Sequence, residues 1–162
     1  MNPYPGLRPF NDTDAPHFRG RDAEIDQLLS LLATRRFVAV TGVSGSGKSS
    51  LVGAGVVPLL RVGFAEGLQA DWRIVVLRPG AGPLQQLEQK LEGSFGARGV
   101  FTKPEDLKSY AVEKLAPGQR LIVVVDQFEE IFDYRREHYS ADGGNECALF
   151  VNLLLTAAEQ RN

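Results

Sequence analysis

The stretch from Gly42 to Ser49, GVSGSGKS, constrains this chain more than any other feature, because its glycines and its lysine stand at fixed spacing. Such a turn can point successive backbone N–H groups inward at one anion, a geometry that side chains at Gly42, Gly45 and Gly47 would obstruct. The apolar run FVAVT precedes the turn, and a helix-forming segment follows it. The sequence therefore predicts a strand, a phosphate-binding loop and a helix, in that order.

The polar groups of this loop have separate expected parts in holding a phosphate chain. Lys48 can reach the β- and γ-phosphates, and Ser49 is placed to offer its hydroxyl to Mg²⁺. The helix that begins at the end of the loop adds its positive N-terminal end. The residues expected to bind the nucleotide here are Gly42, Val43, Ser44, Gly45, Ser46, Gly47, Lys48, Ser49 and Ser50.

A nucleoside triphosphate site also needs carboxylates for the metal and the attacking water, and the run LIVVVDQFEE supplies them. Asp126 is expected to hold Mg²⁺ through its water shell. Glu130 is the preferred group to orient or deprotonate a water, with Glu129 as the alternative. Each of these carboxylates has a plainer reading, Asp126 as a helix cap and the glutamates as solvated residues of a first helical turn.

Strands and helices alternate along most of the chain. Residues 1–20 are rich in proline and glycine and read as an extended arm. From residue 21 the expected strands are FVAVT (37–41), WRIVVLRPG (72–80) and the start of RLIVVVDQFEEIF (120–132). The expected helices are 22–33, 49–61, 83–93, 103–118 and 145–160. Such alternation predicts an α/β fold with a parallel sheet covered by helices on both faces. Arg78, after the second strand, could contact phosphate, although capping the turn is the simpler interpretation.

Composition narrows the class of protein. With 162 residues, 43% of them apolar and 23% charged, the chain reads as one soluble folded domain. A net charge of -2 offers no broad basic surface for nucleic acid. The single cysteine, Cys147, cannot form an internal disulfide and is expected to be a small buried side chain in a helix. The absence of a signal-like leader and of a long apolar run predicts a cytoplasmic protein without a membrane partner.

Several runs together carry a resemblance to a known family: NPYPGLRPF, DAPHFRGRDAEIDQLLSLL, RFVAVTGVSGSGKSSLVGAGVVPLL, VVLRPGAGPLQQL and LIVVVDQFEEIF. They closely resemble the N-terminal part of the novel STAND NTPases, which are signal-transduction ATPases related to NACHT and AP-ATPase proteins. The resemblance implies a P-loop NTPase fold of the ASCE type for residues 21–162, with ATP or ADP and Mg²⁺ as cofactors. It also implies a bacterial signalling switch, closed with ADP and open with ATP, that associates with itself or with downstream repeat or effector domains.

The resemblance further implies an adenine contact and the lack of one strand of the sheet. In such proteins the segment GR followed by an acidic residue lies against the base, so Phe18, Gly20, Arg21 and Glu24 become base-binding candidates. Relatives continue with a strand that carries a sensor arginine and lies between the loop strand and the aspartate strand. We therefore expect a domain truncated before the sensor strand, in which nucleotide binding survives and efficient hydrolysis does not.

Three functions remain open at this point. The first is an ATPase, with Lys48 on the phosphates, whose hydrolysis resets a switch in the intact protein. The second is a nucleotide-gated binding scaffold without turnover. The third is a nucleic-acid-remodelling ATPase, against which the net charge argues.

Overall fold

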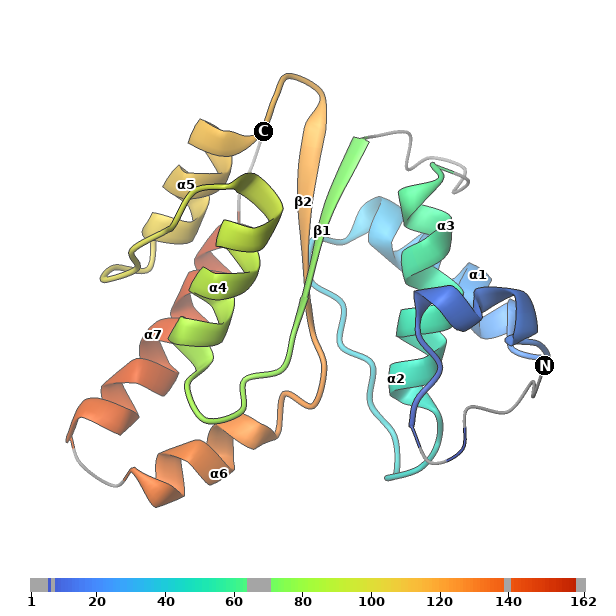
Figure 1. Ribbon diagram of the computed structural model, residues 1–162, viewed down its shortest axis with the longest axis horizontal. Helices are drawn as coiled ribbons and strands as arrows, with labels where there is room; N and C mark the ends of the chain where they lie inside the picture. The colour runs from blue at the N-terminus through green and yellow to red at the C-terminus, as the bar shows by residue number, and fades with distance from the viewer. Residues whose placement is uncertain (1–5, 7, 64–70, 139–140, 160–162) are drawn as a thin grey trace. The chain divides into compact units, whose positions relative to one another are not determined.

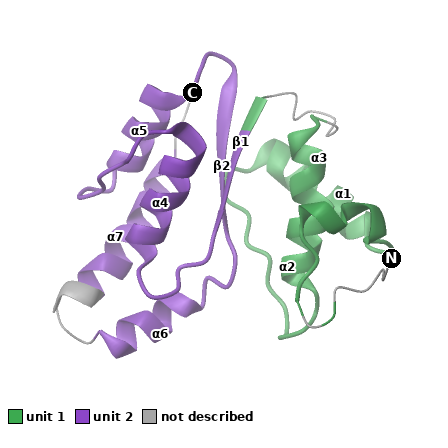
Figure 2. Ribbon diagram, viewed as in Figure 1, with its two compact units in different colours: residues 1–72 green, residues 73–162 purple. Residues whose placement is uncertain are grey.

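The computed structural model describes residue 6 and residues 8–63, 71–138 and 141–159, with the side chains of residues 141–143 left out (Figure 1). The chain divides into two compact units, residues 1–72 and residues 73–162 (Figure 2). The boundary falls within the first residues of strand β1 (Asp71–Leu77).

The first unit is built from short helices. A 3-10 helix, η1 (Asp12–His17), is followed by α1 (Asp22–Thr34), whose first turn is acidic and so complements the positive end of the helix dipole. After the glycine-rich loop the chain turns helical again, and this helix has three consecutive parts: α2 (Lys48–Ser50), a π-helical part η2 (Leu51–Val56) and α3 (Val57–Arg61). The helix predicted at 49–61 is therefore confirmed, with a change of helical type in its middle.

The two glycines in the middle of this helix allow close packing. A Cβ at Gly55 would lie 2.8 Å from two side-chain carbons of Ile25 on α1. A Cβ at Gly53 would lie 3.0 Å from the backbone oxygen of Phe10. Glycine normally weakens a helix, and here it lets α1 and the N-terminal segment approach the helix backbone.

The N-terminal segment is held to this helix by polar contacts as well. The backbone N–H of Phe10 donates to Ser50 Oγ at 3.1 Å. Asp12 forms an ion pair with Arg61 on α3. The rings of Phe10 and Phe18 pack 5.8 Å apart. The segment that the sequence marks as an extended arm thus contains a short helix and docks along the helix that follows the loop.

The prediction of a strand at Phe37–Thr41 is wrong. These residues belong to no strand, and the side chain of Phe37 is 60% exposed. Among the described residues the sheet contains β1 and β2 (Gln119–Val125) and no third strand. A strand is stabilised by hydrogen bonds to a neighbouring strand, and no described strand provides them to this segment.

The second unit has an α/β architecture. Strands β1 and β2 run parallel and are hydrogen-bonded neighbours, connected through α4 (Pro83–Phe95) and α5 (Asp106–Lys114). After β2 come α6 (Glu130–Glu137) and α7 (Ala141–Ala158). Helices α4, α5 and α7 lie on one face of the sheet (Figure 1). The expectation of a parallel sheet with helices packed against it is confirmed in this two-stranded form, whereas helices of this unit are seen on one face and not on both.

The core of this unit lies between the sheet and those helices. Alternation along β1 buries Val75 and Leu77, while Val76 between them is exposed. The helices contribute fully buried side chains at helical spacing, namely Leu87 and Leu91 of α4 and Phe150 and Leu153 of α7. Cys147 is buried among them, which confirms its expected structural role. No helix of the described chain is long and apolar enough to cross a membrane.

Candidate functional site

The backbone of the glycine-rich loop takes conformations that need glycine. Gly45 and Gly47 have φ angles of 76° and 83°, in the left-handed region, and Gly47 caps the N-terminus of α2. A Cβ at Gly42 would lie 3.1 Å from Ser46 Oγ and 3.8 Å from Lys48 Cδ. The loop is therefore a tight cradle of backbone that opens onto the start of a helix.

The lysine of the loop folds back over this cradle. Lys48 Nζ donates to the backbone oxygens of Gly42 at 2.8 Å and of Val43 at 3.1 Å. The loop is closed further by a turn in which the N–H of Ser46 donates to the oxygen of Val43 at 3.2 Å. These contacts hold the ammonium group of Lys48 against two carbonyl oxygens of the loop. A positive charge on a glycine-rich loop at a helix N-terminus is suited to an anion.

Arg21 lies against the same loop. Its Nη1 donates to the backbone oxygen of Ser46 at 3.4 Å, from the N-cap position of α1. Its Nε lies 2.7 Å from Glu24 Oε1, although the N–H is not aligned on that carboxylate and is shielded from solvent. The structure thus brings Arg21 beside the loop, with Glu24 in contact with Arg21.

The other expected nucleotide-binding residues near the loop have packing contacts. Phe18 packs on Phe10, and its ring would lie 3.4 Å from a Cβ at Gly55. Gly20, with a φ of 82°, turns the chain into α1. Ser50 accepts the hydrogen bond from Phe10 described above, so its hydroxyl links the loop helix to the N-terminal segment.

The carboxylates expected to hold the metal and the water, Asp126, Glu129 and Glu130, lie in the second unit. Asp126 directly follows β2, and its backbone N–H donates to the oxygen of Leu77 at 2.9 Å, so the ladder between the strands continues to this residue. Arg78 directly follows β1. Its Nε and Nη2 both donate to Asp126 Oδ2, at 3.0 Å and 2.8 Å. The carboxyl ends of the two strands are therefore joined by an ion pair.

This ion pair was missed by the sequence analysis, which considered Arg78 only as a phosphate contact or a turn cap. Both residues come directly after apolar strand segments, and neighbouring parallel strands end at the same edge of a sheet. That common position is the signal from which the pairing of Arg78 with Asp126 could have been found.

The two glutamates differ in their surroundings. Glu130 Oε2 accepts a hydrogen bond from the N–H of Gly80 at 2.9 Å, which ties the start of α6 to the segment after β1. Glu129 precedes α6 and is exposed. Gln127, in the turn between Asp126 and the glutamates, has a φ of 55°, which is uncommon for a residue with a side chain. The turn therefore holds the two carboxylates in different environments.

A further carboxylate supports this region. Glu146 on α7 accepts from the N–H of Leu84 at 3.2 Å and from the hydroxyl of Tyr134 at 2.6 Å. The hydrogen bond to Glu146, together with burial, raises the pKa of Tyr134 to about 12. Glu146 thus joins the N-terminus of α4 to α6.

The donor groups fit a phosphate chain and a magnesium ion. A tight backbone cradle with a lysine suits phosphate, and the hydroxyl of Ser49 and the carboxylate of Asp126 are the hard oxygen donors that Mg²⁺ prefers. Among the described residues no group of three or more histidine, cysteine, aspartate or glutamate side chains gathers as a metal site. Mg²⁺ commonly takes one or two protein ligands together with phosphate oxygens, so Ser49 in the first unit and Asp126 in the second are each, taken singly, of a type that suits it.

Comparison with known proteins gives one match. The family model described as Novel STAND NTPase 1 matches residues 3–162. No curated protein and no solved structure matches the chain.

Proposed function

Because the chain belongs to the Novel STAND NTPase 1 family, we propose that it is a Mg²⁺-dependent, ATP-binding P-loop NTPase domain of the ASCE type. The observation that carries the proposal is the closed glycine loop, with Lys48 held across it by two backbone oxygens. A backbone cradle of this kind with a fixed ammonium group is suited to the β- and γ-phosphates of a nucleotide.

Each residue of the loop has a part in this proposal. Backbone N–H groups of the loop other than that of Ser46, which donates to Val43, would bind the phosphate oxygens, and Lys48 would offset the negative charge of the phosphates. Ser49 and Asp126 would each offer an oxygen to Mg²⁺. The bound ion would neutralise charge that develops on the phosphate oxygens during hydrolysis. Arg21, Gly20 and Phe18 lie on the side of the adenine base.

The water is oriented by one of the two glutamates. Glu130 is the first candidate and Glu129 the second. Glu130 also accepts a hydrogen bond from the N–H of Gly80. The test therefore needs one variant that removes the carboxylate and keeps this hydrogen bond, and a second variant that removes both. Glu130→Gln keeps an oxygen acceptor for the Gly80 N–H but removes the carboxylate, whereas Glu130→Ala removes both. Single-turnover ATP hydrolysis should be lost in Glu130→Gln and kept in Glu129→Gln, and the reverse result would assign the role to Glu129.

A binding scaffold without turnover is the second candidate function. It is favoured by the contacts that already engage both acidic positions, Arg78 on Asp126 and Gly80 on Glu130. In either case ATP and ADP would mark the two states of a bacterial, cytoplasmic signalling switch, with output through self-association or through repeat or effector domains. Binding of ATP by the intact protein without single-turnover hydrolysis would select the scaffold.

Calorimetric titration of the chain with ATP and ADP, each with and without Mg²⁺, tests the proposal. In Lys48→Ala we expect affinity for ATP to fall by about 100-fold or more, which corresponds to about 2.8 kcal/mol. Lys90→Ala is the matched control, because Lys90 is an exposed lysine of α4 far along the chain from the loop. Equal affinity of wild type and Lys48→Ala would refute the assignment of the loop.

A further inference from the structure

The ion pair at the carboxyl ends of the two strands has a bearing on how the proposed metal site is loaded. The Nε and Nη2 groups of Arg78 both donate to one oxygen of Asp126. Asp126 is therefore charge-paired before any metal arrives. A cation that approaches this carboxylate has to compete with the guanidinium.

We propose that Arg78 is a positioning residue that holds the Asp126 carboxylate in the metal-free protein and releases it on metal loading. This inference rests on the proposed function, since it takes Asp126 as a metal ligand. The side chain of Arg78 is 48% exposed and that of Asp126 is 22% exposed. An ion pair with this exposure is weak enough to be exchanged, because solvent screens the pair and hydrates the released guanidinium.

Release of Arg78 has a structural consequence next to the site. The segment from Arg78 to Gly80 is tied to the segment from Asp126 to Glu130 by two contacts, the ion pair and the hydrogen bond from Gly80 to Glu130. That first segment leads directly into α4, which begins at Pro83. When Asp126 exchanges Arg78 for a metal, the ion pair breaks and the hydrogen bond from Gly80 to Glu130 remains. Metal binding therefore loosens the segment that leads into the start of α4.

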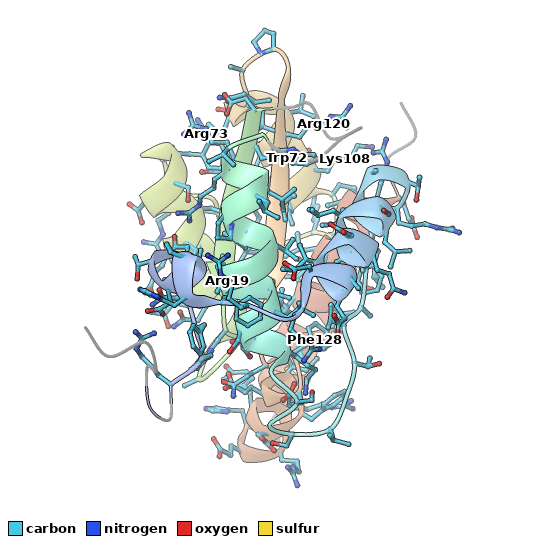
Figure 3. The ribbon with its side chains drawn as sticks, turned by 90° about the vertical axis from the view of Figure 1, so that its right-hand side faces the viewer. Arg19, Trp72, Arg73, Lys108, Arg120 and Phe128 are labelled. Carbon is cyan, nitrogen blue, oxygen red and sulfur yellow. The ribbon has the colours of Figure 1, made fainter. Side chains whose placement is uncertain are left out.

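The experiment compares Arg78→Gln, Arg78→Lys and the control Arg73→Gln. Arg73 is an exposed arginine of β1, the strand that Arg78 follows. Figure 3 shows Arg73 at the end of the sheet opposite to Phe128, and Phe128 follows Asp126 by two residues. Mn²⁺ alone is added to the nucleotide-free, ¹⁵N-labelled chain, and paramagnetic broadening of the Asp126 amide signal is followed. Asp126→Asn sets the level of broadening without the carboxylate.

We expect Arg78→Gln to need up to about fivefold less Mn²⁺ than wild type for half-maximal broadening, the upper end of what an exposed ion pair can account for. Arg73→Gln should behave as wild type, and Arg78→Lys, which keeps the charge but not the pair of guanidinium donors, should lie between wild type and Arg78→Gln. A purely structural role for Arg78 would leave the Mn²⁺ requirement unchanged or raise it, and either result overturns the inference. Because no nucleotide is present, failure here is distinct from failure of the proposed function, which would appear as wild type that binds no ATP in the calorimeter.

Discussion

A glycine-to-alanine substitution in each of two helices should change stability in opposite directions. At Gly55 the new Cβ would lie 2.8 Å from Cδ1 and Cγ1 of Ile25 and 3.4 Å from the ring of Phe18. Carbon atoms pack best at about 3.5–4.0 Å, so Ile25 has to move by about 1 Å inside a packed interface. At Gly93 in α4 no heavy atom lies within 4 Å of the new Cβ.

The magnitudes follow from two contributions. Alanine in place of glycine favours a helix by about 0.8–1.0 kcal/mol. Overpacking of a well-packed site costs about 1–3 kcal/mol. Gly93→Ala should therefore stabilise by about 0.8–1.0 kcal/mol from propensity alone. Gly55→Ala should destabilise by up to about 2 kcal/mol, because crowding offsets and then exceeds the gain.

Urea unfolding followed by far-ultraviolet circular dichroism measures both changes against wild type. The propensity gain is shared by the two variants, so the difference between their free energies of unfolding isolates the crowding at Gly55. A difference of about 1–3 kcal/mol is expected. If the two variants change stability by the same amount, the close approach of α1 to the helix after the loop does not explain why residue 55 is a glycine.

Two further predictions concern single hydrogen-bonded groups. Tyr134→Phe removes the donor to Glu146 and should lower stability by about 0.5–1.5 kcal/mol. Since the pKa of Tyr134 is raised from 10.0 to about 12, its contribution is complete below pH 10 and lost as pH rises through about 12; alkaline unfolding that is no shallower in Tyr134→Phe would contradict this. Hydrogen bonds from Arg8 and from the backbone of Asn11 lower the pKa of Asp14 from 3.8 to about 2, so the stabilisation is complete above about pH 4 and lost as pH falls through about 2. The midpoint of thermal unfolding should therefore fall less between pH 4 and pH 2 in Asp14→Asn than in wild type, and equal slopes would count against the contact.

Local signals in the sequence predicted most helices well. Proline in the first turn places the start of α4 at Pro83, as expected. The end was placed at Gly93, whereas the helix continues to Phe95 and Gly96 takes the left-handed conformation that ends it. Both glycines are compatible with a helix end, and the choice between them depends on the packing that follows, which the local sequence does not contain.

Long-range pairing is what the sequence did not predict. Phe37–Thr41 has the composition of a strand, but a strand forms only where a neighbouring strand can exchange backbone hydrogen bonds with it. In the site, the glycine loop was predictable because its geometry is local. The contact of Arg78 with Asp126 joins residues 48 positions apart, and it depends on which strands lie side by side.

The most direct test of the account is whether the amides of the loop sense a phosphate chain. The ¹⁵N-labelled chain is titrated with ATP, with inorganic triphosphate and with adenosine, while the backbone signals of Gly45, Gly47 and Lys48 are followed by NMR. We predict that these signals shift with ATP and with triphosphate and stay in place with adenosine. Loop signals that do not move at saturating ATP, or that move equally with adenosine, would contradict the claim that this loop binds the phosphates of a nucleotide.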